Sequence, residues 1–235
     1  MQLEVSGLKS GYGKVQILHG IDFTAPPGQI TTVLGANGAG KSTLMKTIAG
    51  HLPVMDGGVR YKGKSLNGHS ALSICKLGIG YVPQSSNVFA ELSVRDNLAA
   101  ASLAFEGAEE RVREVLRRFP ILEERAHQDA STLSGGERQT LAIASALVAA
   151  PDILILDEPT AGLAPIFVDQ IVDWLRELSR EGVGVVWVVE QNPEKILAIS
   201  ETAYVIDAGR NSETVEAKSL LEPGRLEEVL LQAHV

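Results

Sequence analysis

The sequence is poor in several residue types, and each shortage excludes a class of protein. Cys75 is the single cysteine in 235 residues, so the chain cannot form an internal disulfide and a reducing compartment is expected. Cys75 can be interpreted as a reactive thiol or as a plain buried or half-buried side chain, and the second interpretation needs no special surroundings. The five histidines are scattered without the spacing of metal ligands, which predicts no histidine metal site.

Long apolar runs and an excess of positive charge are also missing. The longest apolar candidate, residues 141–156, is interrupted by Pro151 and Asp152, so no membrane-spanning helix is predicted. The start M-Q-L-E-V-S-G lacks the charged and apolar regions of a signal peptide. With 21 basic and 29 acidic residues, the net charge of −8 argues against a nucleic-acid-binding surface, although an acidic total is compatible with a local basic patch. Any membrane role is therefore expected to come through a partner chain.

The chain does contain a phosphate-loop motif. Residues 35–43 read G-A-N-G-A-G-K-S-T and match the pattern G-x-x-x-x-G-K-[ST], between a predicted strand at Ile30–Leu34 and a predicted helix at 42–49. Glycines let the backbone approach phosphates, Lys41 is expected to reach the β- and γ-phosphates, and Ser42 is expected to ligate Mg²⁺. The alternative is an ordinary glycine-rich turn, but the full motif in this context predicts binding of a nucleoside triphosphate.

The residues around this loop predict β structure. Apolar alternation and a Pro-Pro-Gly turn favour short antiparallel strands over residues 2–34. Tyr12 lies between two glycines, where it can either pack on the sheet or offer a flat face to an adenine ring. Beyond the helix, the composition predicts turns at 51–64, then a weak helix near 70–77 and a strand at 79–82.

The middle of the chain is predicted to be helical. Residues 93–119 carry an apolar stripe and are expected to form helix as far as Pro120. Their charges predict ion pairs four residues apart, Glu109 with Arg113 and Glu114 with Arg118. In L-S-G-G-E-R-Q, Ser134 and Glu137 have the spacing of a capping box, which predicts that a second helix begins there.

Two buried strands are predicted in the last third. Ile153 to Leu156 is a continuous apolar run, typical of a parallel sheet covered on both faces, and it ends in Asp157-Glu158. Residues 183–189 form the second run, which ends in Glu-Gln-Asn. A strand at 204–206 follows, and the mixed, acidic tail contains a predicted helix at 225–232. The predicted fold class is α/β, with a mostly parallel sheet around the phosphate loop, an antiparallel β part at 2–34 and a helical insert near 85–150.

Taken in order, these motifs resemble one protein family. The phosphate loop, Gln84 after a strand, L-S-G-G-E-R-Q and I-L-I-L-D-E-P together look like the nucleotide-binding subunit of an ATP-binding cassette (ABC) transporter, over roughly residues 3–209. The stretches S-G-Y-G-K-V-Q-I-L-H-G-I-D-F, G-L-A-P and V-E-Q-N are similar to one branch. That branch is the smaller ATPase subunit of importers for branched-chain amino acids, urea or short-chain amides. The resemblance implies a single P-loop ABC ATPase domain over 1–235, with a core (1–84 and 151–235) and a helical subdomain (85–150).

The resemblance also implies roles for individual residues, with ATP and Mg²⁺ as cofactors. Glu158 polarises the attacking water, Asp157 lies near Mg²⁺, and Gln84 contacts the metal or the water and senses the membrane partner. Ser42 is a metal ligand, and Gln191 stands where a histidine usually touches the γ-phosphate. The remaining residues implied to bind ATP are Tyr12, Gly35, Ala36, Asn37, Gly38, Ala39, Gly40, Lys41 and Thr43, with Ser134, Gly135, Gly136 and Glu137 for the ATP of the opposite subunit.

Two departures from the wider family bear on the partners. Gln191 can donate a hydrogen bond but cannot change charge near neutral pH, and Ala164 stands where a loop aspartate is usual. Both resemble the same branch, and we expect a heterodimer with a second ATPase subunit, with a homodimer as the alternative. The other implied partners are two transmembrane permease subunits and, indirectly, a solute-binding protein, with no nucleic acid. The implied location is peripheral, on the cytoplasmic face of the inner membrane.

The sequence disfavours two other functions of this family. A repair or chromosome ATPase would carry a long coiled coil, and the stretch between Gln84 and Ser134 has no heptad run. A translation factor would carry two cassettes. An exporter subunit, or a scaffold that binds ATP and barely hydrolyses it, remains open.

Overall fold

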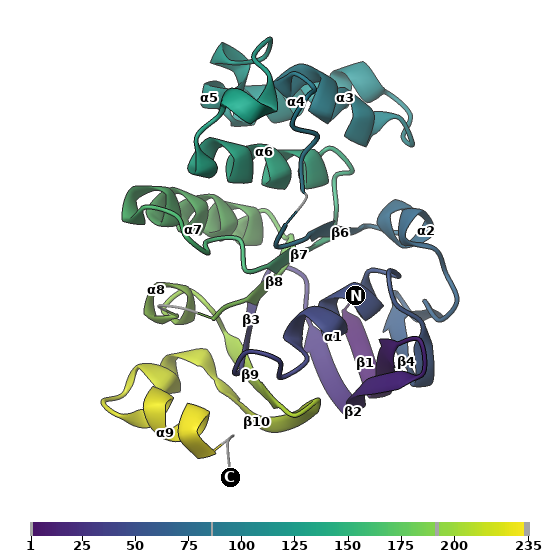
Figure 1. Ribbon diagram of the computed structural model, residues 1–235, viewed down its shortest axis with the longest axis vertical. Coiled ribbons are helices and arrows are strands. Elements are labelled where there is room, and N and C mark those ends of the chain that lie inside the picture. Colours follow the sequence, from purple (N-terminus) through teal and green to yellow (C-terminus); the bar gives the residue numbers. More distant parts are fainter. Residues whose placement is uncertain (1, 86, 191–192, 233–235) are drawn as a thin grey trace.

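The computed structural model describes residues 2–85, 87–190 and 193–232 as two sheets and a cluster of helices (Figure 1). Among the described residues, no helix has the length and apolar composition that a membrane crossing requires. The strands are β1 (Leu3–Tyr12), β2 (Val15–Ala25), β3 (Ile30–Leu34), β4 (Val54–Tyr61), β5 (Lys64–Ser65), β6 (Ile79–Val82), β7 (Ile153–Asp157), β8 (Gly184–Val188), β9 (Thr202–Asp207) and β10 (Arg210–Glu216). The helices are α1 (Lys41–Ile48), α2 (Ala71–Lys76), α3 (Val94–Ser102), α4 (Ala108–Arg118), α5 (Pro120–Glu124), α6 (Gly135–Leu147), α7 (Pro165–Arg180), α8 (Glu194–Leu197) and α9 (Arg225–Gln232), with 3-10 turns at Ala130–Thr132 and Ala217–Leu221.

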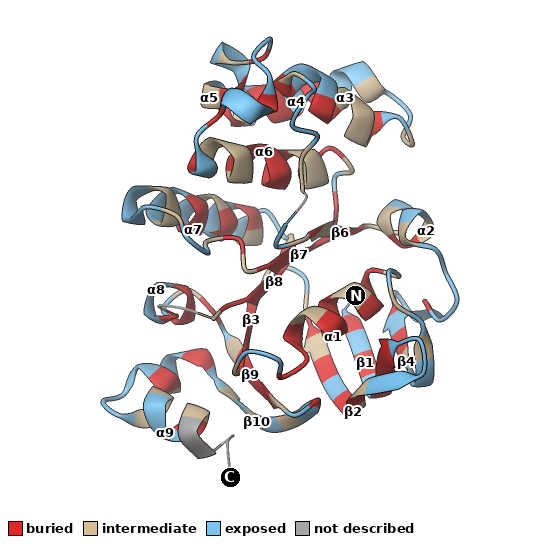
Figure 2. Cartoon of the chain, in the orientation of Figure 1, coloured by how far each residue is buried: buried red, intermediate tan, exposed pale blue. Residues whose placement is uncertain are grey.

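The larger sheet has the strand order β10-β9-β3-β8-β7-β6. Strands β9, β3, β8, β7 and β6 are parallel, and β10 pairs antiparallel with β9. Every residue of β3, β7 and β8 is buried, as expected for apolar strands with helices on both faces (Figure 2). The predicted α/β class and the strands predicted at 30–34, 79–82 and 153–156 are confirmed.

The smaller sheet is antiparallel, with the order β2-β1-β4-β5. The expectation of antiparallel strands over 2–34 is right for β1 and β2 but wrong for β3, which belongs to the parallel sheet. The turns predicted at 51–64 are also wrong, because β4 pairs with β1 over most of this range. Gly57 explains the error: it has a φ of 71° at a register shift, where a Cβ would lie 2.3 Å from the carbonyl oxygen of Gly7.

The helical insert consists of α3 to α6. The single helix predicted at 93–119 is instead two, because Gly107, with a φ of 70°, caps the start of α4. Pro120 does not simply end a helix; it is the first residue of α5, where its missing N–H is tolerated. The predicted stripe on α4 is buried, and it packs with α3 and α6 in an apolar cluster of its own.

An ion pair and an aromatic pair are among the contacts that join this insert to α7 and its end. Arg118 donates two hydrogen bonds to Glu181, of 2.9 and 2.7 Å, and the rings of Phe119 and Trp174 meet edge to face with centroids 4.9 Å apart. The ion pairs predicted within α4 are therefore wrong, since Arg118 pairs with α7's end and Arg113 pairs with Glu110.

Two apolar clusters cover the two faces of the parallel sheet. One contains α1 and residues of both sheets, so α1 lies between them. The other contains α6, α7 and α8 on the opposite face. In the tail, the helix predicted at 225–232 is confirmed as α9. Strand β10 was not predicted, because its residues are mostly polar and alternate only between exposed and half-buried positions.

Candidate functional site

The phosphate loop connects β3 to α1 and depends on its glycines. Gly35, Gly38 and Gly40 have φ values of 148°, 81° and 106°, in the region that favours glycine. A Cβ on Gly35 would lie 2.1 Å from the carbonyl oxygen of Ile206. Among the described residues no side chain caps α1 at Gly40, so the helix N-terminus is available to an anion.

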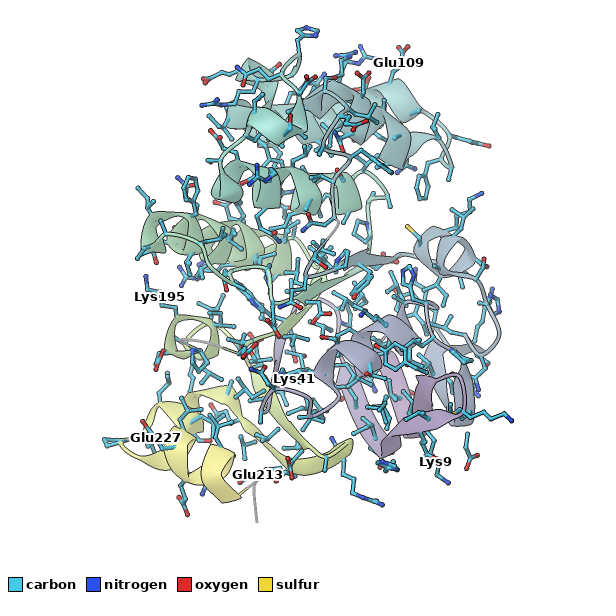
Figure 3. All side chains as sticks on the ribbon, viewed as in Figure 1. Lys9, Lys41, Glu109, Lys195, Glu213 and Glu227 are labelled. Carbon is cyan, nitrogen blue, oxygen red and sulfur yellow. The ribbon has the colours of Figure 1, made fainter. Side chains whose placement is uncertain are left out.

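Lys41 is the first residue of α1 and lies at the middle of the molecule (Figure 3). Its Nζ donates hydrogen bonds of 2.7 and 2.9 Å to the carbonyl oxygens of Gly35 and Ala36. Burial lowers the pKa of Lys41, while the nearby carboxylates of Glu158, Glu190 and Asp157 oppose the shift. The ammonium group is thus held over the loop within a cluster of acids.

Ser42 and Asp157 come together although they are far apart in the sequence. The Ser42 hydroxyl donates a 3.0 Å hydrogen bond to Asp157 Oδ1 at the carboxyl end of β7, and the Tyr81 hydroxyl donates one of 3.2 Å to Oδ2. Burial raises the pKa of Asp157, and the two hydroxyl donors oppose it. A hydroxyl and a carboxylate beside a phosphate loop are the hard oxygen donors that fit Mg²⁺, which commonly completes its shell with phosphates and water. Within the described ranges, no group of three or more His, Cys, Asp or Glu residues could hold a metal ion by itself.

Glu158 follows Asp157 in a strained conformation, with a φ of 51°. Its N–H donates to the carbonyl oxygen of Val188, and its Oε2 accepts a 2.6 Å hydrogen bond from Nε2 of Gln84. Burial, followed by the hydrogen bond and negative charge of Glu190, raises the pKa of Glu158 to about 7. Gln84, Glu158 and Glu190 line one cavity of about 690 Å³. Gln84, expected at the metal or the water, thus joins the site through Glu158.

The L-S-G-G-E segment begins α6, on the face of the sheet opposite α1. Both halves of the predicted capping box are present: Ser134 Oγ accepts from the Glu137 N–H at 3.3 Å, and Glu137 Oε2 accepts from the Ser134 N–H at 2.8 Å. A Cβ on Gly136 would lie 2.3 Å from the ring of Phe167. The structure therefore separates this segment from the phosphate loop of the same chain.

Tyr12 and Ala164, which the sequence also singled out, lie at the surface of the protein. Tyr12 is 47 % exposed beside the β1–β2 turn, so it does not contribute to the core. Ala164 is the N-cap residue of α7, where an aspartate could cap the helix and alanine cannot. Gln191 lies outside the described residues.

Sequence reasoning missed Tyr81 and Glu190. Glu190 could have been found, because β7 and β8 are parallel neighbours and an acidic residue follows the end of each, which brings Glu158 and Glu190 to the same edge of the sheet. Tyr81 gave no such signal: it is an interior strand residue whose hydroxyl reaches Asp157 only once β6 pairs with β7.

Comparison with known proteins gives the class. Residues 18–161 match the family described as ABC transporter, and the chain belongs to that family. It is 44 % identical over 201 residues to the high-affinity branched-chain amino acid transport ATP-binding protein BraG of Pseudomonas aeruginosa, covering 85 % of this chain and 86 % of that protein. It is 40 % identical over 226 residues to the probable branched-chain amino acid transport ATP-binding protein LivF of Archaeoglobus fulgidus, covering 95 % and 96 %.

A relative with a different named role is also close. The lipopolysaccharide export system ATP-binding protein LptB of Escherichia coli K12 is 33 % identical over 238 residues, covering 99 % of this chain and 94 % of that protein. Among solved structures, a nucleotide-free ATP-binding cassette from an ABC transporter superposes with a TM-score of 0.88 at 23 % identity, covering 100 % and 99 % of the two chains. That match shows the shared ABC ATPase fold.

Proposed function

We propose that this chain hydrolyses ATP as the energy-coupling subunit of an importer for branched-chain or similar hydrophobic amino acids. The observation that carries hydrolysis is the convergence of Lys41, Ser42, Asp157 and Glu158 around one phosphate loop. The transported class rests on the names of the two relatives with 40 % and 44 % identity.

Lys41 and the loop would bind the phosphates. The two hydrogen bonds from Lys41 to loop carbonyls can be exchanged for bonds to β- and γ-phosphate oxygens, which are stronger because both partners are charged. The N-terminus of α1 adds N–H groups and a favourable dipole. Asn37, Ala39 and Thr43 complete the proposed loop contacts, and Tyr12 is proposed to stack on adenine because its exposed ring is available.

Glu158 would orient the attacking water. Its carboxylate lies in the cavity with Glu190, and the Gln84 amide restrains one of its oxygens. A carboxylate with a raised pKa is a better proton acceptor, and phosphoryl transfer depends mainly on positioning and charge neutralisation. When bound, Mg²⁺ supplies charge neutralisation at the phosphates, and Ser42 and Asp157 are the residues that would hold it.

A partner ATPase subunit would complete the site. Because Ser134, Gly135, Gly136 and Glu137 lie across the sheet from the phosphate loop, we propose that they contact the γ-phosphate of ATP bound by that partner. Gln191 and Ala164 favour a different ATPase over a second copy of this chain. Two transmembrane permeases and, indirectly, a solute-binding protein complete the proposed assembly. In it this chain lies peripherally on the cytoplasmic face of the inner membrane.

Glu158→Gln is the direct test of hydrolysis. The variant should lose about a hundredfold or more of its turnover, since catalysis rests on the positioned carboxylate, and should retain ATP. Turnover and nucleotide retained after gel filtration are the measurements. Glu194→Gln, in the same cavity but exposed on α8, is the matched control and should keep its turnover. Unchanged turnover in Glu158→Gln would contradict the proposal.

The named role of LptB supports a second candidate, energy coupling for lipid export. Affinity capture of this chain from detergent-solubilised native membranes, with mass spectrometry of the captured proteins, separates the two. Permeases with a second, different ATPase support the amino-acid importer, and permeases accompanied by this ATPase alone favour export. Capture of soluble proteins only would contradict both.

A further inference from the structure

A chain of contacts leads from Arg125, just after α5, to the first turn of α6. Arg125 Nη2 forms an ion pair of 2.9 Å with Glu137 Oε1. The other carboxylate oxygen, Oε2, accepts the hydrogen bond from the Ser134 N–H at 2.8 Å. The two carboxylate oxygens of Glu137 thus have different partners: Oε1 pairs with Arg125, and Oε2 accepts from the backbone of the turn.

The pair is more sheltered than an ordinary surface ion pair. The Glu137 side chain is 12 % exposed and that of Arg125 is 34 % exposed, whereas the Arg113–Glu110 pair on α4 is 55 % and 48 % exposed. Burial works against the charged form of Glu137, but its hydrogen bonds with Ser134 and the positive charge of Arg125 lower its pKa overall. Glu137 therefore stays ionised and fixed in one orientation.

Arg125 itself is held by elements outside α6. Its guanidinium also donates to Gln128 Oε1 at 3.3 Å. The residues that follow Arg125 are hydrogen-bonded to the start of α3. The N–H of Arg95 donates to the carbonyl oxygen of Ala126, and the N–H of Val94 donates to the carbonyl oxygen of Gln128, each at 2.9 Å. The position of the guanidinium is thus set by α3 and α5, and not by the turn that it supports.

The turn is weak without this support. The Ser134 hydroxyl accepts from the Glu137 N–H at 3.3 Å, at the long end for a hydrogen bond, and two glycines follow Ser134. Glycines give the backbone freedom to leave the capped conformation. The hydrogen bond from the Ser134 N–H to the Glu137 carboxylate opposes this, so a fixed carboxylate keeps the N–H groups at the start of α6 in one direction.

We propose that Arg125 is a positioning residue for the Ser134–Glu137 turn, holding the Glu137 carboxylate so that the turn is preorganised to receive the γ-phosphate of ATP on a partner subunit. This rests on the proposed function, because the phosphate belongs to the partner. Arg125 contacts Glu137 at the start of α6, on the opposite face of the sheet from the phosphate loop, and so its removal should leave ATP binding by the isolated chain unchanged.

Hydrogen–deuterium exchange of the purified full chain tests the positioning. In Arg125→Ala, amides of the peptide covering 133–139 should exchange about tenfold faster, which corresponds to losing roughly one charge-assisted contact. Arg125→Lys keeps the charge and a hydrogen-bonding group but loses the planar fork of the guanidinium, and should restore part of the protection. Arg113→Ala removes the exposed pair on α4 and is the matched control; it should leave this peptide unchanged. Unchanged protection in Arg125→Ala overturns the proposal, and unaltered exchange in the β7 peptide shows that the variant is folded.

Turnover of the assembly captured from membranes is the second measurement. In Arg125→Ala, kcat should fall about tenfold because the partner's phosphate meets a less ordered turn, while the ATP affinity of the isolated variant stays constant. Faster exchange with unchanged kcat also overturns the proposal. Failure of the proposed function would appear differently, as absent turnover in the unchanged assembly or full turnover in Glu158→Gln.

Discussion

Two helices of this chain begin at glycine-rich turns suited to anions, and they are completed in opposite ways. Helix α1 follows Gly40, which has a left-handed φ and no capping side chain among the described residues. Helix α6 follows Ser134 and has a complete capping box with a carboxylate, Glu137, in its first turn. In the first turn of α1, Ser42 is half-buried and the other residues are buried, with Lys41 5 % exposed, whereas Ser134 lies at the surface.

The difference indicates which helix start depends on a ligand. A carboxylate in the first turn of α6 satisfies one orphan N–H and interacts favourably with the helix dipole, so α6 is complete without a ligand. The first turn of helix α1 instead contains Lys41, a positive charge at the positive end of the dipole, which is unfavourable until an anion arrives. The phosphate loop is therefore expected to gain stability when ATP binds, whereas the α6 turn is expected to keep its conformation without a ligand.

Removing the lysine should give the largest effect. In Lys41→Ala the affinity for ATP should fall about a hundredfold or more, because the charged donor to two phosphates is lost. The unliganded protein should not become correspondingly less stable, since burial of Lys41 is itself unfavourable. Titration with a fluorescent ATP analogue and thermal unfolding without nucleotide measure the two effects.

Lys76→Ala is the control for this comparison. Lys76 is an exposed lysine in the last turn of α2, and its removal should leave ATP affinity within twofold. ATP binding by Lys41→Ala with unchanged affinity would contradict the assignment of α1 as the nucleotide-binding helix.

The two glycines of the α6 turn should respond differently to the same added methyl group. A Cβ on Gly136 would overlap the Phe167 ring at 2.3 Å, whereas a Cβ on Gly135 would meet Leu163 at 3.7 Å, an ordinary contact. Gly136→Ala should lower the free energy of unfolding by about 1–3 kcal/mol through overpacking, and Gly135→Ala should not. Denaturant unfolding of both variants measures this.

The reason for the difference can be tested in the same experiment. Adding Phe167→Ala to Gly136→Ala should recover part of the lost stability, because the clash disappears, although Phe167→Ala alone is destabilising. Strictly additive effects of the two substitutions would show that Phe167 is not what Gly136 must accommodate.

The sequence predicts those features that a local pattern encodes. The phosphate loop, the apolar runs of β3 and β7 and the Ser134–Glu137 capping box each need fewer than a dozen consecutive residues, and all are confirmed in the fold. Asp157 and Glu158 were found for the same reason, since they follow directly from a buried strand. The resemblance to the family added the roles of residues that local patterns leave undefined.

Features that depend on distant pairing were missed. Strand β4 contains Asp-Gly-Gly, which reads as a turn, and becomes a strand only because β1 supplies its hydrogen bonds. Arg118 pairs with Glu181 at the end of α7 instead of a neighbour on its own helix, and Arg125, just after α5, pairs with Glu137 in the first turn of α6. These contacts are set by how α4, α5, α6 and α7 pack, which periodicity within one segment cannot specify.

The smallest expected effect is a difference in the sign of pH dependence between two carboxylates. Burial and Glu190 raise the pKa of Glu158 from 4.5 to about 7, so its favourable contribution to stability is present below pH 4.5 and is lost as the pH rises through about 7. For Glu137, burial is outweighed by Ser134 and Arg125, which lower the pKa; its contribution is present above pH 4.5 and is lost as the pH falls below it. Both groups are partly exposed, which keeps the effects small.

Thermal unfolding of Glu158→Gln and Glu137→Gln, each compared with the unchanged chain across pH, separates these contributions from all other titrating groups. Glu158→Gln should match the unchanged chain below pH 4.5 and exceed its stability above about pH 7, because an ionised Glu158 then faces Glu190. Glu137→Gln should be less stable at neutral pH, with a gap that closes on acidification as Glu137 itself becomes neutral. Differences that move in the same direction with pH would contradict the opposite environments of these two carboxylates, Glu158 after β7 and Glu137 in the first turn of α6. They would also contradict the argument that Arg125 keeps Glu137 ionised and the α6 turn ordered before any nucleotide arrives.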